Sequence, residues 1–317
     1  MQKQYQTSEG SIAYWVHRYS SDAPNVVFLP GLTADHRLFD DQIVYFSGMS
    51  DGPVRETSIR NREILTSKRV VGDRPGKGGT SANAASSCED AGCCRVRANC
   101  LVWDPPSHGA SRPFALTWSL DDMARALHGI LETEGFAHPI LVGQSMGGFL
   151  SQVYMELFPD EVRGFAAIDS APMKRSYYAK WELAFLHHTH GMYSAIPWSL
   201  LLKWGPAGCA TTERGRTNMR EMMEDYVKSE YVDLAAHGYA AVAQAVETDR
   251  AYDIDCPCVL ICGSKDSAGS SRRYSRTWAK REGMPLHWIE GAGHNSCVDA
   301  PDETNRILGE FIRSSSV

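Results

Sequence analysis

The 317-residue sequence lacks several features that mark particular classes of protein. Its longest apolar stretches, such as WSLLLKW, are too short to cross a bilayer, and the first ten residues, MQKQYQTSEG, contain no apolar leader. There is no excess of positive charge either, because 32 Lys and Arg face 38 Asp and Glu, which leaves a net charge of -6. Such a chain has no basic field to attract phosphates. We therefore expect a cytoplasmic protein with a small-molecule substrate, no membrane span and no nucleic-acid partner; its oligomeric state stays open.

Patterns typical of disulfide frameworks and metal sites are also missing. The nine cysteines are odd in number and scattered, and Cys256, Cys258 and Cys262 lie in an apolar run typical of a buried strand, as small core residues. Three histidines are closely spaced, but no cysteine or carboxylate with ligand spacing accompanies them: His187, His188 and His190. We expect no disulfides, no metal and no cofactor.

One segment, residues 47–98, contains no aromatic residue and few large aliphatic residues. It is rich in Gly, Ser and Arg, and cannot bury enough apolar area to offset the entropy lost on ordering. Cys88, Cys93 and Cys94 within it match no zinc pattern. We expect a disordered insertion that is functional, dispensable or was never selected to fold. It should lie at the amino end of the sheet, opposite the carboxyl ends of the strands where catalytic residues of a parallel sheet lie.

Outside that segment, strand patterns alternate with helix patterns. After an early hairpin, short apolar runs occur at 25–29, 100–104, 139–143, 164–169, 257–263 and 286–289. Amphipathic helical patterns lie between them, the first behind a possible cap at Asp35. This order predicts an α/β fold with a mostly parallel sheet covered on both faces, built from residues 1–170 and 251–317. Residues 171–250 hold no strand pattern and are rich in aromatics and methionine, which predicts an inserted helical lid.

The stretch GQSMG places Ser145 between Gly143 and Gly147, directly after an apolar strand and before a helix. Glycines allow the sharp strand-to-helix turn that exposes a nucleophilic serine above the sheet. A serine needs a base and an orienting acid. For a serine on such a strand-to-helix turn, these follow along the chain in the order acid, then histidine. His294 follows the last strand and Asp266 the one before it; Asp169, also after a strand, stays open as an alternative acid.

The chain resembles the α/β-hydrolase family in FLPGL, DPPSHGAS, GQSMGG, GSKD and GAGH. The resemblance implies that Ser145 is the nucleophile, His294 the general base and acid, and Asp266 the orienting acid. It also implies an oxyanion hole made by the backbone N–H groups of Leu32 and Met146. In the family a histidine commonly stands where this chain has Pro30, which affects the shape of the Leu32 loop. His108, in DPPSHGAS, matches a turn where the family's histidine is more often structural.

These motifs predict a cofactor-independent serine hydrolase that cleaves a small or medium apolar carboxylic ester through an acyl-serine intermediate. The aromatic lid favours an apolar acyl group, although its aromatics could equally serve its own packing. A C–C bond, a lactone or an amino-terminal peptide bond could be cleaved by the same residues, and a low-turnover ligand-binding protein is the alternative outside enzymes. Dehalogenation is disfavoured because in this fold it uses an aspartate where this chain has Ser145.

Overall fold

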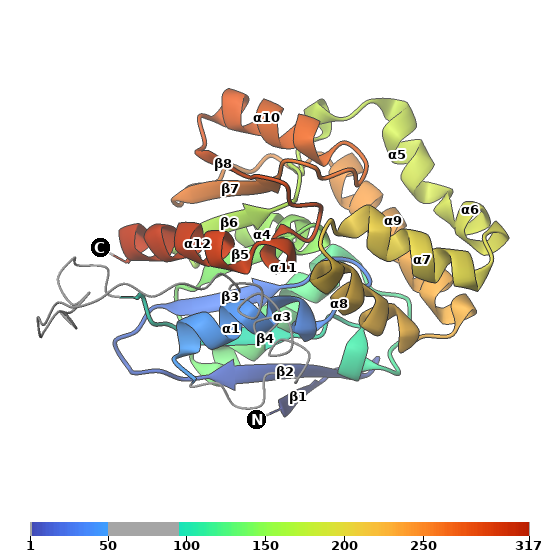
Figure 1. Cartoon of the computed structure of the whole chain (residues 1–317). Coiled ribbons are helices and arrows are strands. Elements are labelled where there is room, and N and C mark those ends of the chain that lie inside the picture. The colour runs from blue at the N-terminus through green and yellow to red at the C-terminus, as the bar shows by residue number, and fades with distance from the viewer. Residues whose placement is uncertain (1, 50–94, 317) are drawn as a thin grey trace, which may run out of the picture.

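A computed structural model describes residues 2–49 and 95–316 (Figure 1). Its centre is an eight-stranded sheet with the order β1-β2-β4-β3-β5-β6-β7-β8. The strands are β1 (Gln2–Gln6), β2 (Ser11–His17), β3 (Asn25–Leu29), β4 (Asn99–Trp103), β5 (Ile140–Gln144), β6 (Gly164–Ile168), β7 (Cys258–Gly263) and β8 (Leu286–Ile289). The pairs β1–β2 and β2–β4 are antiparallel and all others are parallel, so the predicted hairpin and mostly parallel sheet are confirmed.

Helices cover the two faces of the sheet, with α1 and α12 packed together on one face and α3 and α4 on the other (Figure 1). The helices outside the insertion between β6 and β7 are η1 (His36–Phe39), α1 (Asp40–Ser47), η2 (Gly109–Ser111), α3 (Leu120–Glu134), α4 (Met146–Leu157), α10 (Ser271–Glu282), α11 (Ser296–Asp299) and α12 (Pro301–Ser315). Strands β4, β5 and β6 are buried along their whole length, as expected for parallel strands covered on both faces.

Local sequence signals account for several element boundaries. Ser119 and Asp122 form a capping box that starts α3, and Gly135 ends it in the left-handed conformation at φ 63°. Asp35 caps the short helix η1 by accepting a hydrogen bond from the Arg37 N–H. The predicted helix behind Asp35 is therefore real, but it begins as a 3-10 turn before α1 continues it.

The insertion between β6 and β7 is helical, and its helices lie together at one side of the molecule (Figure 1). They are η3 (Arg175–Tyr177), α5 (Lys180–His187), α6 (Thr189–Ala195), α7 (Trp198–Cys209), α8 (Glu213–Glu224) and α9 (Lys228–Glu247). Helix α8 packs against η1 and α11, and α9 packs against α3 and α4. The insertion therefore contacts the segments that follow the carboxyl ends of β3, β5 and β8. Across residues 2–49 and 95–316, no helix is long and apolar enough to cross a membrane.

Most of the predicted disordered insertion, residues 50–94, lies outside the described residues. At its margins the prediction was too wide, because Ser47 is the buried last residue of α1 and Ala98 is fully buried. The Ala98 N–H donates to the Phe46 carbonyl oxygen at 3.0 Å. The end of α1 and the start of β4 are thus held side by side by this hydrogen bond, as expected for a helix that leads into the next strand.

Candidate active site

Ser145 lies on a tight turn between β5 and α4, with φ 51° and ψ -117°. A positive φ is unfavourable for a side chain with a Cβ, so the turn depends on its neighbours. A Cβ on Gly147 would lie 2.0 Å from the Leu29 carbonyl oxygen, and one on Gly143 would lie 2.4 Å from the Gly147 oxygen. The Ser145 N–H donates to the Ile168 carbonyl oxygen at 2.9 Å. Glycines at both positions therefore allow the turn to form.

His294 lies between Ser145 and Asp266 and contacts both. Its Nε2 is 2.9 Å from Ser145 Oγ, and its Nδ1 is 2.9 Å from Asp266 Oδ2. The carboxylate is fully buried and the imidazole is 13% exposed. Because a carboxylate can only accept, Nδ1 carries the proton and Nε2 presents its lone pair to the serine hydroxyl. The three predicted residues thus form one hydrogen-bonded line from three strand ends of a parallel sheet.

Nearby negative charges raise the pKa of the His294 imidazole, so it is protonated more easily than an ordinary histidine. Burial by itself lowers the pKa of His294, but the negative charge and hydrogen bond of Asp266, together with the charge of Asp169, outweigh it and raise the pKa above its ordinary 6.5. The Asp266 carboxylate also accepts a hydrogen bond from the Ala268 N–H at 2.8 Å through its other oxygen. Such an acid orients the base and stabilises its protonated form.

Asp169, the alternative acid, is buried but turned to other partners. Its Oδ1 accepts from the Gly263 N–H at 2.7 Å, and its Oδ2 accepts from the Ser296 N–H at 3.0 Å and hydroxyl at 2.6 Å. Burial and the nearby charge of Asp266 raise the pKa of Asp169. Asp169 thus ties the end of β7 to the segment after His294, while Asp266 makes the hydrogen bond to the imidazole.

The two predicted oxyanion donors belong to the segments that follow β5 and β3. Met146 is the first residue of α4, and Leu32 lies in the loop after β3. The loop is close to the nucleophile, since a Cβ on Gly31 would lie 3.0 Å from Ser145 Cβ. Among residues 2–49 and 95–316, no protein acceptor takes the backbone N–H of Leu32 or Met146. Whether these two N–H groups bind an oxyanion stays a prediction.

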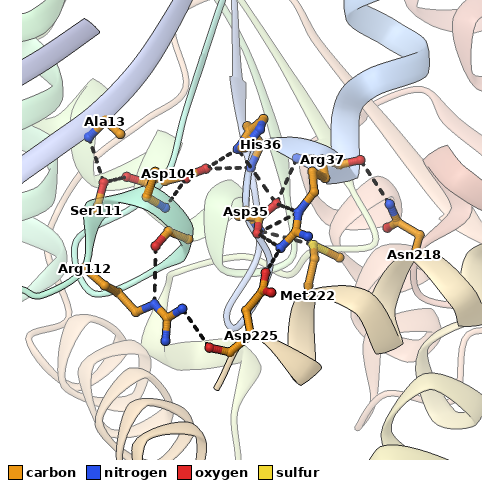
Figure 2. Close-up of polar contacts among 12 residues, drawn as sticks. Ala13, Asp35, His36, Arg37, Asp104, Ser111, Arg112, Asn218, Met222 and Asp225 are labelled. Atoms are coloured by element: carbon orange, nitrogen blue, oxygen red, sulfur yellow. Dashed lines mark hydrogen bonds and ion pairs between the residues drawn. The ribbon is translucent and has the colours of Figure 1, made fainter. Parts of the chain in front are cut away.

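The segment after Leu32 is held by Arg37 and Asp225, which the sequence analysis did not identify, and by Asp35, which it named only as a possible helix cap (Figure 2). Arg37 hydrogen-bonds the buried Asp35 through Nε and Nη2 and reaches Asp225 at the end of α8. The Asp35 N–H donates to the thioether Sδ of Met222 at 3.4 Å, and the Asn218 side chain donates to the Arg37 carbonyl oxygen at 3.1 Å. The insertion therefore contacts the loop directly. The sequence carries no signal for the contacts to α8 and its end, because these partners lie far apart along the chain.

Gln144, the residue before Ser145, was also missed by the sequence analysis. Its Nε2 donates to the His294 carbonyl oxygen at 2.9 Å, and the side chain is 2% exposed. Its Oε1 lies against Gly31, where a Cβ would come within 2.3 Å. Gln144 therefore packs between the loop that carries Leu32 and the segment that carries His294.

Within the part of the chain that the structure describes, two clusters each bring three possible metal ligands together. One consists of Asp35, His36 and Asp104, and the other of Asp169, Cys262 and Asp266. In the first group, Asp104 Oδ1 accepts from the His36 backbone N–H at 2.8 Å and contacts His36 Nδ1 at 2.7 Å, while Asp35 is paired with Arg37 (Figure 2). In the second, both carboxylates accept protein hydrogen bonds as described above. Protein partners thus already engage the carboxylates of both groups.

The three closely spaced histidines make separate contacts. His187 pairs with Glu247 and His190 with Asp233, and His188 contacts a backbone oxygen of its own helix. The six described cysteines are free thiols. Cys258 and Cys262 belong to β7 as predicted, but Cys256 lies before the strand, and of these three cysteines only Cys262 is buried.

Comparison with known proteins adds a family to this geometry. The sequence model of the alpha/beta hydrolase family matches residues 26–307. The 2-(acetamidomethylene)succinate hydrolase of Mesorhizobium japonicum is 23% identical over 229 residues, which are 67% of this chain and 77% of the relative. The fluoroacetate dehalogenase of a Burkholderia species is 26% identical over 236 residues, 64% of this chain and 74% of the relative.

Solved structures share the fold. The esterase EaEST from Exiguobacterium antarcticum superposes with a TM-score of 0.65 over 99% of this chain and 100% of its own, at 16% identity. At such low identity the likeness shows the fold alone.

Proposed function

The chain belongs to the alpha/beta hydrolase family and is a hydrolase, and from this premise we propose that it is a serine hydrolase acting on a small or medium apolar carboxylic ester. The observation that carries the proposal is the hydrogen-bonded line from Ser145 Oγ through His294 to Asp266, with both contacts at 2.9 Å. A serine so placed loses its proton to the imidazole as it attacks a carbonyl carbon.

The mechanism follows from these positions. Ser145 Oγ attacks the ester carbonyl while His294 Nε2 takes its proton, and the imidazolium is stabilised by Asp266. The oxygen of the tetrahedral intermediate accepts hydrogen bonds from the Leu32 and Met146 N–H groups, each worth about 2.7–4 kcal/mol in the transition state. His294 then protonates the departing alcohol, which leaves an acyl group on Ser145. Water, deprotonated by His294, releases the acid and restores the serine.

The relatives and the insertion bear on the substrate. One relative is a dehalogenase, but this chain has a serine hydroxyl at the elbow, which favours acyl transfer. The other relative's name is a hydrolase, in keeping with a water-consuming reaction. We assign residues 171–250 as a lid over the acyl group, on a core of residues 1–170 and 251–317, because α8 and α9 pack against elements next to Ser145 and Leu32.

The test is hydrolysis of p-nitrophenyl acetate and butyrate by the wild type, Ser145→Ala and a control, Ser21→Ala, at an exposed serine. A fluorophosphonate probe that reacts with activated serines is applied to all three. We expect the wild type and Ser21→Ala to hydrolyse ester and take up label, and Ser145→Ala to do neither. Labelling without ester hydrolysis would move the proposal to a C–C bond, a lactone or a peptide bond. A folded wild type that neither labels nor hydrolyses would refute it.

A further inference from the structure

His108 is a buried histidine that the proposed mechanism does not use. It is 0% exposed and lies in the turn between β4 and η2. Its Nδ1 is 2.9 Å from the Pro106 carbonyl oxygen, and its Nε2 is 3.0 Å from the Thr33 backbone nitrogen. A carbonyl oxygen can only accept and a backbone N–H can only donate. Nδ1 therefore carries the proton, and Nε2 accepts from Thr33 as the lone pair of a neutral ring.

The environment favours that neutral state. Burial lowers the pKa of His108 to about 4, so the ring keeps its lone pair throughout the range in which a serine hydrolase works. A protonated ring would present a second N–H to the Thr33 N–H, leaving two buried donors face to face. The acceptor at this position is thus constant with pH, unlike that of His294.

Thr33 needs such a partner because its backbone is strained. Its φ is 64°, an uncommon conformation for a β-branched residue. It follows Leu32 in a turn closed by the Ala34 N–H, which donates to the Gly31 oxygen at 3.2 Å. A positive φ at the third position of a four-residue turn normally calls for glycine. Rotation of the peptide unit between Leu32 and Thr33 would relieve the strain and turn the Thr33 N–H away from His108.

The strained turn lies next to the backbone group that the proposed mechanism uses. The peptide unit that His108 holds adjoins Leu32, whose N–H is the proposed oxyanion donor, and the turn begins at Gly31 beside Ser145. If the unit rotates, Leu32 moves with it. Resting on the proposed function, we propose that His108 is a positioning residue: as a neutral acceptor for Thr33 it holds the strained turn in the conformation that aims the Leu32 N–H at the oxyanion.

The packing around His108 supports this role. The neighbouring Gly109 has φ 44°, and a Cβ there would lie 2.9 Å from Asp35 Cβ, so the two turns are in close contact. Trp118 lies beside the His108 ring, with ring centres 6.3 Å apart, and its carbonyl oxygen contacts His237 Nε2 of α9 at 2.8 Å. The ring thus lies between the turn of residues 31–34 and Trp118, which contacts α9 of the insertion.

The experiment compares His108→Gln, whose amide oxygen can accept from Thr33, with His108→Leu, which has no acceptor. Each is titrated to completion with the fluorophosphonate so that rates refer to active enzyme. We expect His108→Leu to lose about 10–100-fold in kcat and in affinity for a trifluoromethyl ketone, which forms an oxyanion on the serine, with KM within about threefold of the wild type. His108→Gln is expected to keep both within about fivefold.

Equal losses in both variants, or an unchanged kcat in His108→Leu, would overturn the inference. A merely structural role would lower the titratable fraction and leave kcat per active site unchanged. Nitrogen-15 NMR of histidine in the wild type, with the His108 signal assigned by its absence in His108→Gln, should show the neutral ring protonated at Nδ1; protonation at Nε2 would also overturn it. A wild type that takes up no label refutes the proposed function instead, which separates the two failures.

Discussion

Replacing each of the two buried carboxylates near His294 by its amide separates their roles. Asp266 and Asp169 are both almost fully buried, and both follow a strand of the parallel sheet. The structure gives them different partners, so Asp266→Asn and Asp169→Asn form a matched pair of nearly equal size and opposite expectation. Both variants are compared with the wild type in kcat/KM for p-nitrophenyl butyrate between pH 5 and 9.

Asp266→Asn removes the group that accepts from His294 Nδ1 at 2.9 Å. An amide can donate its N–H to Nδ1, which would hold the ring in the tautomer that has no lone pair for Ser145. The corresponding change in a Ser-His-Asp triad lowers kcat about 10⁴-fold, which is about 5.4 kcal/mol in the barrier. We expect a loss of that order without a large change in KM.

Asp169→Asn leaves the hydrogen bond between Asp266 and His294 intact, so its effect on the imidazole is electrostatic. The amide keeps one of the two backbone donors, Gly263 or Ser296, and loses the other, which lowers stability rather than the pKa of His294. An oxygen of Asp169 lies within 4.8 Å of one of Asp266, and Asp266 lies 2.9 Å from the imidazole. A charge about 5–8 Å from the ring at an effective dielectric of about 20 is worth about 2–3 kcal/mol, or about 1.5–2.5 pH units. Since the pKa of Asp169 is itself raised to about 7, part of that charge is absent near neutrality, and a shift of about 1–2 units is expected.

The sign follows from the state that His294 needs. The base works when neutral, and its pKa is raised above 6.5, so wild-type kcat/KM falls as the pH drops through a midpoint above 6.5. Removing the charge of Asp169 lowers that pKa and moves the acid limb to lower pH. The reasoning is refuted if Asp169→Asn is as inactive as Asp266→Asn, if its acid limb moves to higher pH, or if Asp266→Asn keeps more than about a tenth of the activity.

Three further predictions concern the frame of the site. Replacing residues 50–94 by a short Gly-Ser linker should leave kcat within about twofold, since α1 and β4 are joined by their own hydrogen bond; activity lost with the fold intact would contradict this. Arg37→Met leaves the buried Asp35 without its cation and should lower the free energy of unfolding at pH 7 by about 3–5 kcal/mol in urea titrations; a change below about 1 kcal/mol would contradict this. Because a Cβ at Gly147 would meet the Leu29 oxygen at 2.0 Å, Gly147→Ala should abolish labelling, and a labelled, active variant would contradict the proposed elbow.

Arg37→Met also has a predicted pH dependence. Burial raises the pKa of Asp35, but the hydrogen bonds and charge of Arg37 outweigh it, so the net pKa lies below the ordinary 3.8. A depressed carboxyl pKa stabilises the fold at pH values above the unfolded pKa, and the gain is lost as the pH falls through the folded one. Without the Arg37 guanidinium the pKa of Asp35 rises in the variant. The stability difference between the wild type and Arg37→Met should therefore be full at neutral pH, shrink as the pH falls through the higher pKa of the variant, and be lost below the depressed pKa of the wild type.

Much of the fold follows from local patterns in the sequence. Apolar runs of strand length alternate with amphipathic helical segments, and such an alternation is compatible with few architectures besides a mostly parallel sheet covered on both faces. The glycines around Ser145 similarly indicate a tight turn after β5, because nearby backbone atoms exclude a side chain there. The roles of Ser145, His294, Asp266, Leu32 and Met146 stay predictions until activity is measured.

The order of residues along the chain shows which polar side chains follow a strand. The folded arrangement selects which of those side chains come into contact. Asp169 and Asp266 both follow strands, β6 and β7, and the backbone beyond each strand turns one toward Ser296 and the other toward His294. The hydrogen bond from Thr33 to His108 likewise joins two separate loops. Local spacing sets the periodicity of an element, whereas a side chain's direction and partners depend on dihedral angles and on packing against segments far away in the chain.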